Sequence, residues 1–263
     1  MKLDSIYFAL IASLLLFVGC KKDSVSDKCP IVKQVRYLNE QMMETFSYTY
    51  ENSMLKTKEQ VSYLSPTNST IFTAKYEYNG SKMTKVLTIF NGSPIGDFRY
   101  SYNVEGKLIN VEPYNSSGQA VSTSSFVYNE GRLIKISLRK ANGYFGNEYD
   151  AHFTYTGGNV TGLRLKPFPT GEETVSEFGY TGHKNTHFSD QVYGFSTDDI
   201  YQLPIYLSEN LVASQKFTSG STTTNKNYSY EFMKNGRVSK VIENAIGTAS
   251  PIRVVTENTC SCK

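Results

Sequence analysis

Short runs in which aromatic and polar residues alternate recur along the whole chain. Phe98, Tyr100 and Tyr102, for example, are separated by single polar residues. Successive side chains of a β-strand point to opposite faces, so this period of two predicts a strand with one buried face. Asn- and Gly-rich turn sequences follow most runs, and a short aliphatic segment follows each turn. Each unit therefore predicts a β-hairpin.

These units recur at a nearly constant step of about 26 residues, which is typical of a repeat architecture. The last aromatic residues of the units are Tyr50, Tyr78, Tyr102, Tyr128, Tyr155, Tyr180, Tyr206 and Phe232, and the unit at Tyr206 is the weakest. Eight hairpins predict an all-β domain of about 16 antiparallel strands in meander order, with little helix. We expect a flattened or strongly curved barrel-like sheet, because closure removes exposed strand edges.

The aromatic face of such a sheet can turn either inward or towards lipid. An outward aromatic face, with a polar lumen, is the pattern of an outer-membrane barrel. Such barrels are seldom lipidated, and this chain ends in Cys-Ser-Cys-Lys rather than in an aromatic strand. We therefore expect the Tyr and Phe side chains to point inward, with the Tyr hydroxyls bound to partners or water.

The segment 181–205 breaks the repeat, because no second strand is evident in it. Ser196 or Thr197 could cap a short helix that runs through Tyr201 and that Pro204 would end. We predict that this segment forms a cap or plug over one end of the sheet.

The first residues predict export. Residues 6–18 form an apolar stretch of about 13 residues, which has the length of a signal-peptide core and is shorter than the roughly 20 needed to span a bilayer. Phe17-Val18-Gly19-Cys20 resembles a bacterial lipobox, although Phe17 stands where Leu is usual. The resemblance implies a signal peptide over residues 1–19 and an acylated Cys20 that anchors the protein to the lipid bilayer. An ordinary secretory signal and an uncleaved anchor are the alternatives.

Residues 20–28 are polar and predict a flexible tether, which leaves a single β-repeat domain over residues 29–263. Lys21-Lys22-Asp23 looks like the charged leader of many Bacteroidota surface lipoproteins. Asp23-Ser24-Val25 resembles the O-glycosylation motif of that phylum, which implies a glycan on Ser24. We expect an exported outer membrane lipoprotein that faces either the periplasm or the cell surface.

Three further cysteines, Cys29, Cys260 and Cys262, lie at the two ends of the predicted domain. Because exported proteins meet an oxidising compartment, we predict a disulfide from Cys29 to Cys260 or Cys262. It would close a loop of roughly 230 residues and requires the first and last strands to be neighbours. A local Cys260–Cys262 pair and free thiols are the alternatives, and the spacing does not suit zinc.

The strings YNVEGKL and YNEGRL resemble the repeats of the RHS/YD family, which build curved β shells. Together with the lipobox, the degenerate repeats look more like a family of Bacteroidota lipoproteins described as having a porin-like fold. This resemblance covers most of residues 30–258. It implies a shell without catalytic residues.

Composition and motifs exclude several functions. Lys+Arg, at 27, exceeds Asp+Glu, at 24, by only three, and the charges form no basic stripe that would indicate nucleic-acid binding. The chain contains no phosphate loop, nucleophile elbow or dinucleotide fingerprint. We expect no cofactor. His183 and His187 could share a metal only on a helix, which Gly182 and Asn185 disfavour, so we expect solvated loop histidines and no metal.

The leading hypothesis is a non-enzymatic envelope lipoprotein that binds a glycan, lipid or protein ligand or acts as a scaffold. The first alternative is an envelope hydrolase with a site in residues 182–204, which requires His183, His187, Asp198 and Asp199 to converge. Asp198 and Asp199 also suit the start of a helix, where the dipole favours negative charge. The second alternative is a purely structural lipoprotein.

Overall fold

The computed structural model describes residues 30–65, 68–141, 148–185, 203–246 and 252–261. These residues form sixteen strands and one helical turn. The strands are β1 (Ile31–Leu38), β2 (Gln41–Glu51), β3 (Met54–Ser65), β4 (Asn68–Asn79), β5 (Lys82–Phe90), β6 (Ser93–Tyr102), β7 (Leu108–Asn115), β8 (Ser122–Asn129), β9 (Arg132–Lys140), β10 (Glu148–Thr156), β11 (Asn159–Phe168), β12 (Thr174–Lys184), β13 (Asn210–Ser219), β14 (Thr222–Phe232), β15 (Val238–Ile246) and β16 (Ile252–Cys260). The helix is α2 (Leu203–Leu207).

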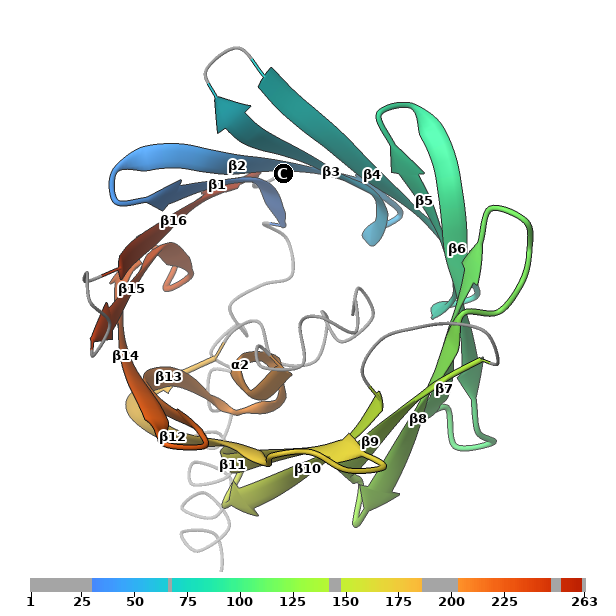
Figure 1. The fold of residues 1–263 in the computed structure, drawn as a ribbon. Helices are drawn as coiled ribbons and strands as arrows, with labels where there is room; N and C mark the ends of the chain where they lie inside the picture. Colours follow the sequence, from blue (N-terminus) through green and yellow to red (C-terminus); the bar gives the residue numbers. More distant parts are fainter. Residues whose placement is uncertain (1–29, 66–67, 142–147, 186–202, 247–251, 262–263) are drawn as a thin grey trace, which may run out of the picture.

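The sixteen strands form one closed antiparallel barrel (Figure 1). Each strand pairs with its neighbours in sequence, and β1 pairs with β16 to close the ring. The all-β fold, the meander order and the number of strands are therefore as predicted from the repeat.

The two ends of the chain supply the eighth strand pair of the barrel. Seven pairs follow one another along the chain, from β2–β3 to β14–β15, and the remaining pair joins β16 to β1. Ile31 lies opposite Cys260 in this pair, so the first and last strands are neighbours. The weak unit that we expected at Tyr206 is not a strand, because Tyr206 lies in α2.

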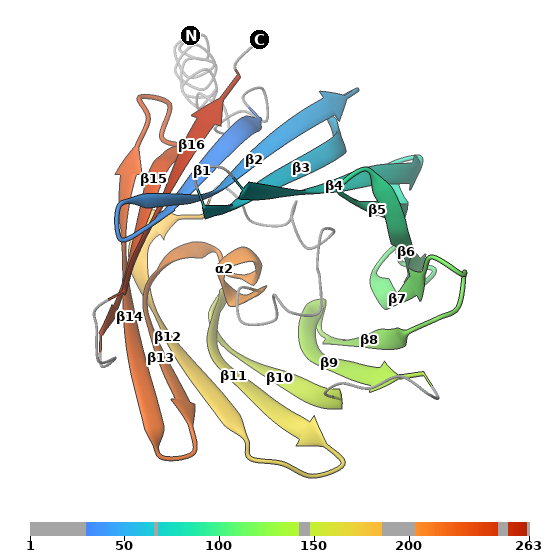
Figure 2. The same cartoon turned by 45° about the horizontal axis from the view of Figure 1, so that its top comes forward.

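The segment that breaks the repeat separates β12 from β13, which nevertheless pair with each other. Its described part contains α2, which lies within the ring of strands (Figures 1 and 2). Pro204 is the second residue of α2, and the helix that we predicted from Ser196 or Thr197 through Tyr201 lies outside the described residues. Proline is tolerated in the first turn, where its missing N–H has no intrahelical partner. In the described part of the chain, no helix is long and apolar enough to cross a membrane.

The aromatic and aliphatic side chains of the repeat point into the barrel, as expected. One cluster of buried side chains runs from β4 to β13 and includes Tyr76, Tyr100, Phe126 and Ile136. Leu203 from α2 belongs to the same cluster and is 2% exposed. Burial of these apolar groups stabilises the barrel from within.

Hydrogen bonds from tyrosine hydroxyls tie successive strand pairs together. In each case the tyrosine lies on the first strand of a pair. The acceptor is a backbone carbonyl oxygen near the start of the strand before it, which belongs to the preceding pair. The pairs are Tyr50–Ile31, Tyr78–Leu55, Tyr102–Met83, Tyr155–Leu133, Tyr180–Val160 and Tyr230–Val212. Because Ile31 opens β1, the first of these bonds joins β2 to the pair formed by the chain ends. The repeated tyrosine therefore links neighbouring units as well as filling the core.

The outer face of the barrel carries cross-strand ion pairs around its circumference. They are Lys85–Glu77, Lys135–Asp150, Lys216–Glu177 and Lys240–Glu257. Transmembrane barrels instead present an apolar band with aromatic girdles to the lipid. The outer face of this barrel differs in carrying these ion pairs.

Candidate functional site

The inner surface of the barrel is divided into an apolar and a polar half. The buried core lies over β4–β13, whereas β2 and β14, which are described along their whole length, contain no buried residue. Many inward positions of β14–β16 and β1–β3 carry polar and charged side chains, alongside apolar ones such as Phe46, Val241 and Val254. We call the polar and charged side chains the polar wall: Gln34, Arg36, Glu44, Tyr48, Lys58, Gln60, Ser62, Lys226, Tyr228, Glu243, Thr256 and Asn258.

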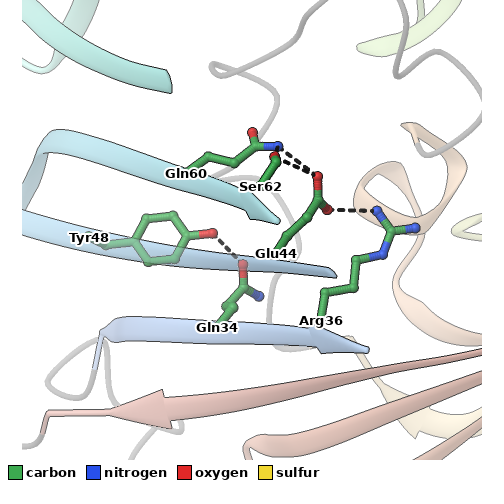
Figure 3. A network of polar contacts seen from close by, with 6 residues as sticks. All are labelled: Gln34, Arg36, Glu44, Tyr48, Gln60 and Ser62. Atoms are coloured by element: carbon green, nitrogen blue, oxygen red, sulfur yellow. Dashed lines mark hydrogen bonds and ion pairs between the residues drawn. The ribbon is translucent and has the colours of Figure 1, made fainter. Parts of the chain in front are cut away.

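Glu44 is the centre of the first group of contacts on the polar wall (Figure 3). Its Oε2 lies 3.3 Å from Nη1 of Arg36, which is the residue opposite on β1. Its Oε1 accepts hydrogen bonds from Nε2 of Gln60 at 2.7 Å and from Oγ of Ser62 at 3.3 Å. One carboxylate thus joins three strands through charge-assisted hydrogen bonds.

Gln34 is the centre of a second group, which crosses the closure between β1 and β16. Its Oε1 accepts a hydrogen bond from the hydroxyl of Tyr48 (Figure 3). Its Nε2 donates to Oδ1 of Asn258 at 2.8 Å, and Nδ2 of Asn258 donates to the carbonyl oxygen of Val238 at 3.1 Å. This chain of amides connects β2 with β15.

The polar wall continues towards the core at β14 and β13. Lys226 and Glu243 form an ion pair of 2.7 Å. The hydroxyl of Tyr228 donates to Oε1 of Gln215 at 3.1 Å, and Nε2 of Gln215 donates to Oγ of Ser176 at 3.3 Å. Gln215 is buried, so these bonds satisfy an amide at the edge of the apolar core.

The tyrosines of the polar wall remain protonated donors at neutral pH. Burial, with a smaller effect of Tyr206, raises the pKa of Tyr48 well above its ordinary value. Burial, with a smaller effect of Glu243, does the same to the pKa of Tyr228. Because Tyr206 belongs to α2, its influence on Tyr48 indicates that α2 lies near this part of the wall.

Solvent reaches the charged side chains of the polar wall. The side chains of Arg36 and Glu44 are 41% and 20% exposed, and those of Lys226 and Glu243 are 34% and 23% exposed. In the described residues, no group of three or more His, Cys, Asp or Glu side chains could hold a metal. The wall offers hydrogen-bond donors and acceptors to solvent.

The structure describes only some of the predicted site residues. His183 lies near the end of β12, exposed, with its ring centroid 4.9 Å from that of Phe232. His187, Asp198 and Asp199 lie outside the described residues, as do the predicted modification sites Cys20 and Ser24, so convergence with His183 stays untested. Cys260 ends β16, and its predicted partners Cys29 and Cys262 also lie outside the described residues.

Our sequence reasoning missed the polar wall, although a signal for it was present. Glu44 stands two residues before Phe46, in the same alternation that places Phe46, Tyr48 and Tyr50 on one face of β2. A charged residue in an aromatic register breaks the rule that buried positions are apolar. The repeat is recognised by its aromatic residues, so a polar residue at an inward position, such as Glu44, does not stand out in it.

Comparisons with known proteins support the fold. No protein-family model and no curated protein sequence matches the chain. A porin-like protein from Bacteroides uniformis ATCC 8492 has a similar structure, with a TM-score of 0.61 and 16% sequence identity over 88% of this chain and 98% of that one. A porin-like protein from Bacteroides vulgatus ATCC 8482 matches with a TM-score of 0.47 and 10% identity over 87% of this chain and 97% of that one. The first likeness shows a shared porin-like fold, while the resemblance to RHS/YD repeats stays a prediction.

Proposed function

We propose that the chain is an outer membrane lipoprotein, anchored through acylated Cys20, whose water-facing barrel binds a small polar ligand without chemical turnover. The observation that carries the binding role is the polar wall. A barrel that needed only stability would gain more from apolar side chains at these inward positions, because charges buried even in part lose hydration.

The outer face of the barrel favours water rather than lipid as its surroundings. Lys135 and Asp150 on one side, and Lys240 and Glu257 on another, would face the hydrocarbon if the barrel spanned a membrane. A Lys on the lipid face of such a barrel costs roughly 2–4 kcal/mol at the bilayer midplane. A lipid on Cys20 therefore fits this barrel as its means of attachment, with the tether of residues 20–28 between the lipid and β1.

The absence of turnover is proposed from the chemistry of the polar wall. Catalysis of acyl transfer needs a nucleophile within hydrogen-bond reach of a general base. The hydroxyls of Tyr48 and Tyr228 donate to amide oxygens, those of Gln34 and Gln215. The hydroxyl of Ser62 donates to Glu44, but this carboxylate is also bound by Arg36 and Gln60. These groups therefore hold one another in place for recognition.

Two measurements test the membrane anchor. Intact mass of the protein purified from the membrane of a producing bacterium should show a chain that begins at acylated Cys20, and C20S should move the protein to the soluble fraction. A mature chain that begins elsewhere and carries no lipid would contradict the anchor.

The binding role is tested by the melting temperature of the full mature chain against a panel of free amino acids, neutral sugars, phosphate and polyamines. We expect at least one class to raise the melting temperature of the wild type and to lose that effect in E44Q. The matched control is E59Q, which makes the same substitution on the outer face, in β3. Binding at the wall would be contradicted if the panel raised the melting temperature of neither the wild type nor E44Q, or raised that of both equally.

A further inference from the structure

We infer that the polar wall binds a neutral sugar through an array of amide and hydroxyl groups. This inference rests on the proposed binding function and names the class of its ligand. The site that we assign consists of Gln34, Gln60 and Asn258, with Glu44 and Arg36 as oriented charged partners.

Both carboxylates of the polar wall are paired with a cation within it. Glu44 is paired with Arg36, and Glu243 is paired with Lys226. The remaining cation, Lys58, places its ammonium 5.0 Å from the centroid of the Phe46 ring. Recognition of a phosphate or carboxylate uses converging cationic donors, often a bidentate Arg. Both carboxylates are paired, and Arg36, Lys226 and Lys58 each have a partner on the wall. These cations therefore do not converge on an anion, and the arrangement favours an uncharged ligand.

The amide groups give the wall its hydrogen-bonding character. Gln34 both accepts, from Tyr48, and donates, to Asn258. An amide side chain offers two donors and a carbonyl acceptor, and a hydroxyl likewise donates and accepts. A ligand with several hydroxyl groups can therefore form hydrogen bonds with these amides at several points. An apolar ligand would instead leave polar groups of the wall without a hydrogen-bond partner.

The closed barrel disfavours an extended peptide as the occupant. Peptides that bind sheets usually add a strand to a free edge through main-chain hydrogen bonds. Here β1 pairs with β16 on one side and with β2 on the other, so the polar wall has no free edge. Recognition at the wall must use side chains, which is the way a sugar is bound.

An aromatic side chain stands close to the array. Tyr206 from α2 is near enough to Tyr48 to contribute to the raised pKa of that residue, and it is only partly buried. Ligand sites typically combine apolar or aromatic surface with a few placed polar groups. We assign contact with the C–H face of a pyranose to Tyr206.

The test is titration of the full mature chain with maltohexaose, cellohexaose, xylohexaose and mannohexaose, monitored by tyrosine fluorescence, because the chain has 20 Tyr and no Trp. Hexagalacturonate and a neutral hexapeptide serve as probes of the other classes. We expect saturable binding of at least one neutral hexasaccharide, weakened about tenfold or more in Q34L and in Q60L and unchanged in the outer-face variant E59Q.

The outcomes separate the ligand class from the binding function. Loss of sugar binding in Q34L and Q60L, with melting temperatures near that of the wild type, supports the inference. Binding of hexagalacturonate or of the peptide alone, abolished by E44Q, overturns the sugar class and leaves the binding function intact. Failure of all four neutral sugars to bind overturns the inference, as does sugar binding that neither Q34L nor Q60L weakens.

Discussion

The hydroxyl of Tyr155 donates a hydrogen bond of 2.9 Å to the carbonyl oxygen of Leu133, which belongs to the preceding hairpin. The guanidinium of Arg132, the residue before Leu133, lies 5.5 Å from the centroid of the Tyr155 ring. Tyr102 has the same relation to Met83 and Lys82, with distances of 2.8 Å and 5.6 Å. The turn sequences Tyr-Asn-Gly-Ser-Lys-Met (residues 78–83) and Tyr-Asn-Glu-Gly-Arg-Leu (residues 128–133) therefore each bind the tyrosine of the next unit.

Y155F should lower the free energy of unfolding by about 1 kcal/mol, because a half-buried carbonyl loses its side-chain donor while the ring still packs. Y37F, at an outer-face position of β1, should change it by less than about 0.5 kcal/mol. Urea denaturation followed by circular dichroism measures both. Equal effects of the two substitutions would show that the inter-unit hydrogen bond does not contribute.

The repeat made the hairpins predictable, and the cysteines at the two chain ends indicated that the first and last strands are neighbours. Alternation and period are local signals, so the hairpins could be read from Tyr50 to Phe232. The pairing of β16 with β1 joins the two ends of the chain, and only the cysteines beside these strands indicated it. The strand that we expected at Tyr206 is absent for a related reason. The eighth strand pair is formed by the two ends of the chain, β16 and β1, and Tyr206 lies in α2. Polar residues at inward positions, such as Glu44, became visible only once the barrel fixed which face is inside.

The barrel should unfold cooperatively at alkaline pH. Burial raises the pKa of Tyr180 to about 12, against a small opposing effect of its hydrogen bond with Ser208. Burial also raises the pKa of Tyr155 to about 12, and those of Tyr76 and Tyr100 further. A tyrosine whose pKa is raised by folding stabilises the native state fully below its unfolded value near 10, and this contribution is lost as pH rises towards 12.

Absorbance at 295 nm as a function of pH checks this expectation. The native protein should ionise few tyrosines near pH 10 and the remainder together with unfolding. Independent ionisation of all tyrosines near pH 10 in the folded protein would contradict the burial.

Asp150 on the outer face should contribute to stability against acid. Partial burial acts to raise the pKa of Asp150. Hydrogen bonds from Lys135, Ser137 and Arg139 outweigh burial and lower this pKa to about 2. Because folding lowers the pKa, the contribution is complete above about pH 4 and is lost as pH falls towards 2.

D150N should therefore cost about 1 kcal/mol at pH 7, as expected for a well-formed but solvent-screened network. The difference between D150N and the wild type should shrink as pH falls from 4 to 2. Denaturant titrations at these pH values measure it. A difference that stays constant with pH would show that the loss comes from packing instead of charge.

Gly96 stands at a position in β6 that no other residue fits. Its φ is +152°, and a Cβ there would lie against the carbonyl oxygen of Tyr114 on β7, well inside van der Waals contact. G96A should therefore destabilise the barrel by more than about 2 kcal/mol, because backbone must move. In the turn before β6, Gly92 has φ +83° and nothing within 4 Å of its ideal Cβ, so G92A should cost only about 1 kcal/mol. If thermal unfolding showed that G96A and G92A lower the free energy of unfolding equally, the strain at Gly96 would come from its φ alone and not from the contact with Tyr114.

The closure of the barrel brings the predicted disulfide within reach of a direct test. Ile31 lies opposite Cys260, and the backbone N–H of Ser261 donates to the carbonyl oxygen of Pro30 at 3.1 Å. Cys260 itself forms no disulfide in the described part of the chain. Since Cys29 directly precedes Pro30, a bridge from Cys29 to Cys260 or Cys262 would fasten the two end strands together.

We expect the mass of the protein purified from an oxidising compartment to rise by about 2 Da on reduction, and peptide mapping to link Cys29 to one of the C-terminal cysteines. C29S should lower the free energy of unfolding by about 2–5 kcal/mol under oxidising conditions and by much less after reduction. The reduced wild type should then unfold like C29S, because the bridge acts by restricting the unfolded chain. If reduction changes neither mass nor stability, the tyrosine bonds and strand pairing of β1, β2 and β16 must hold the closure alone.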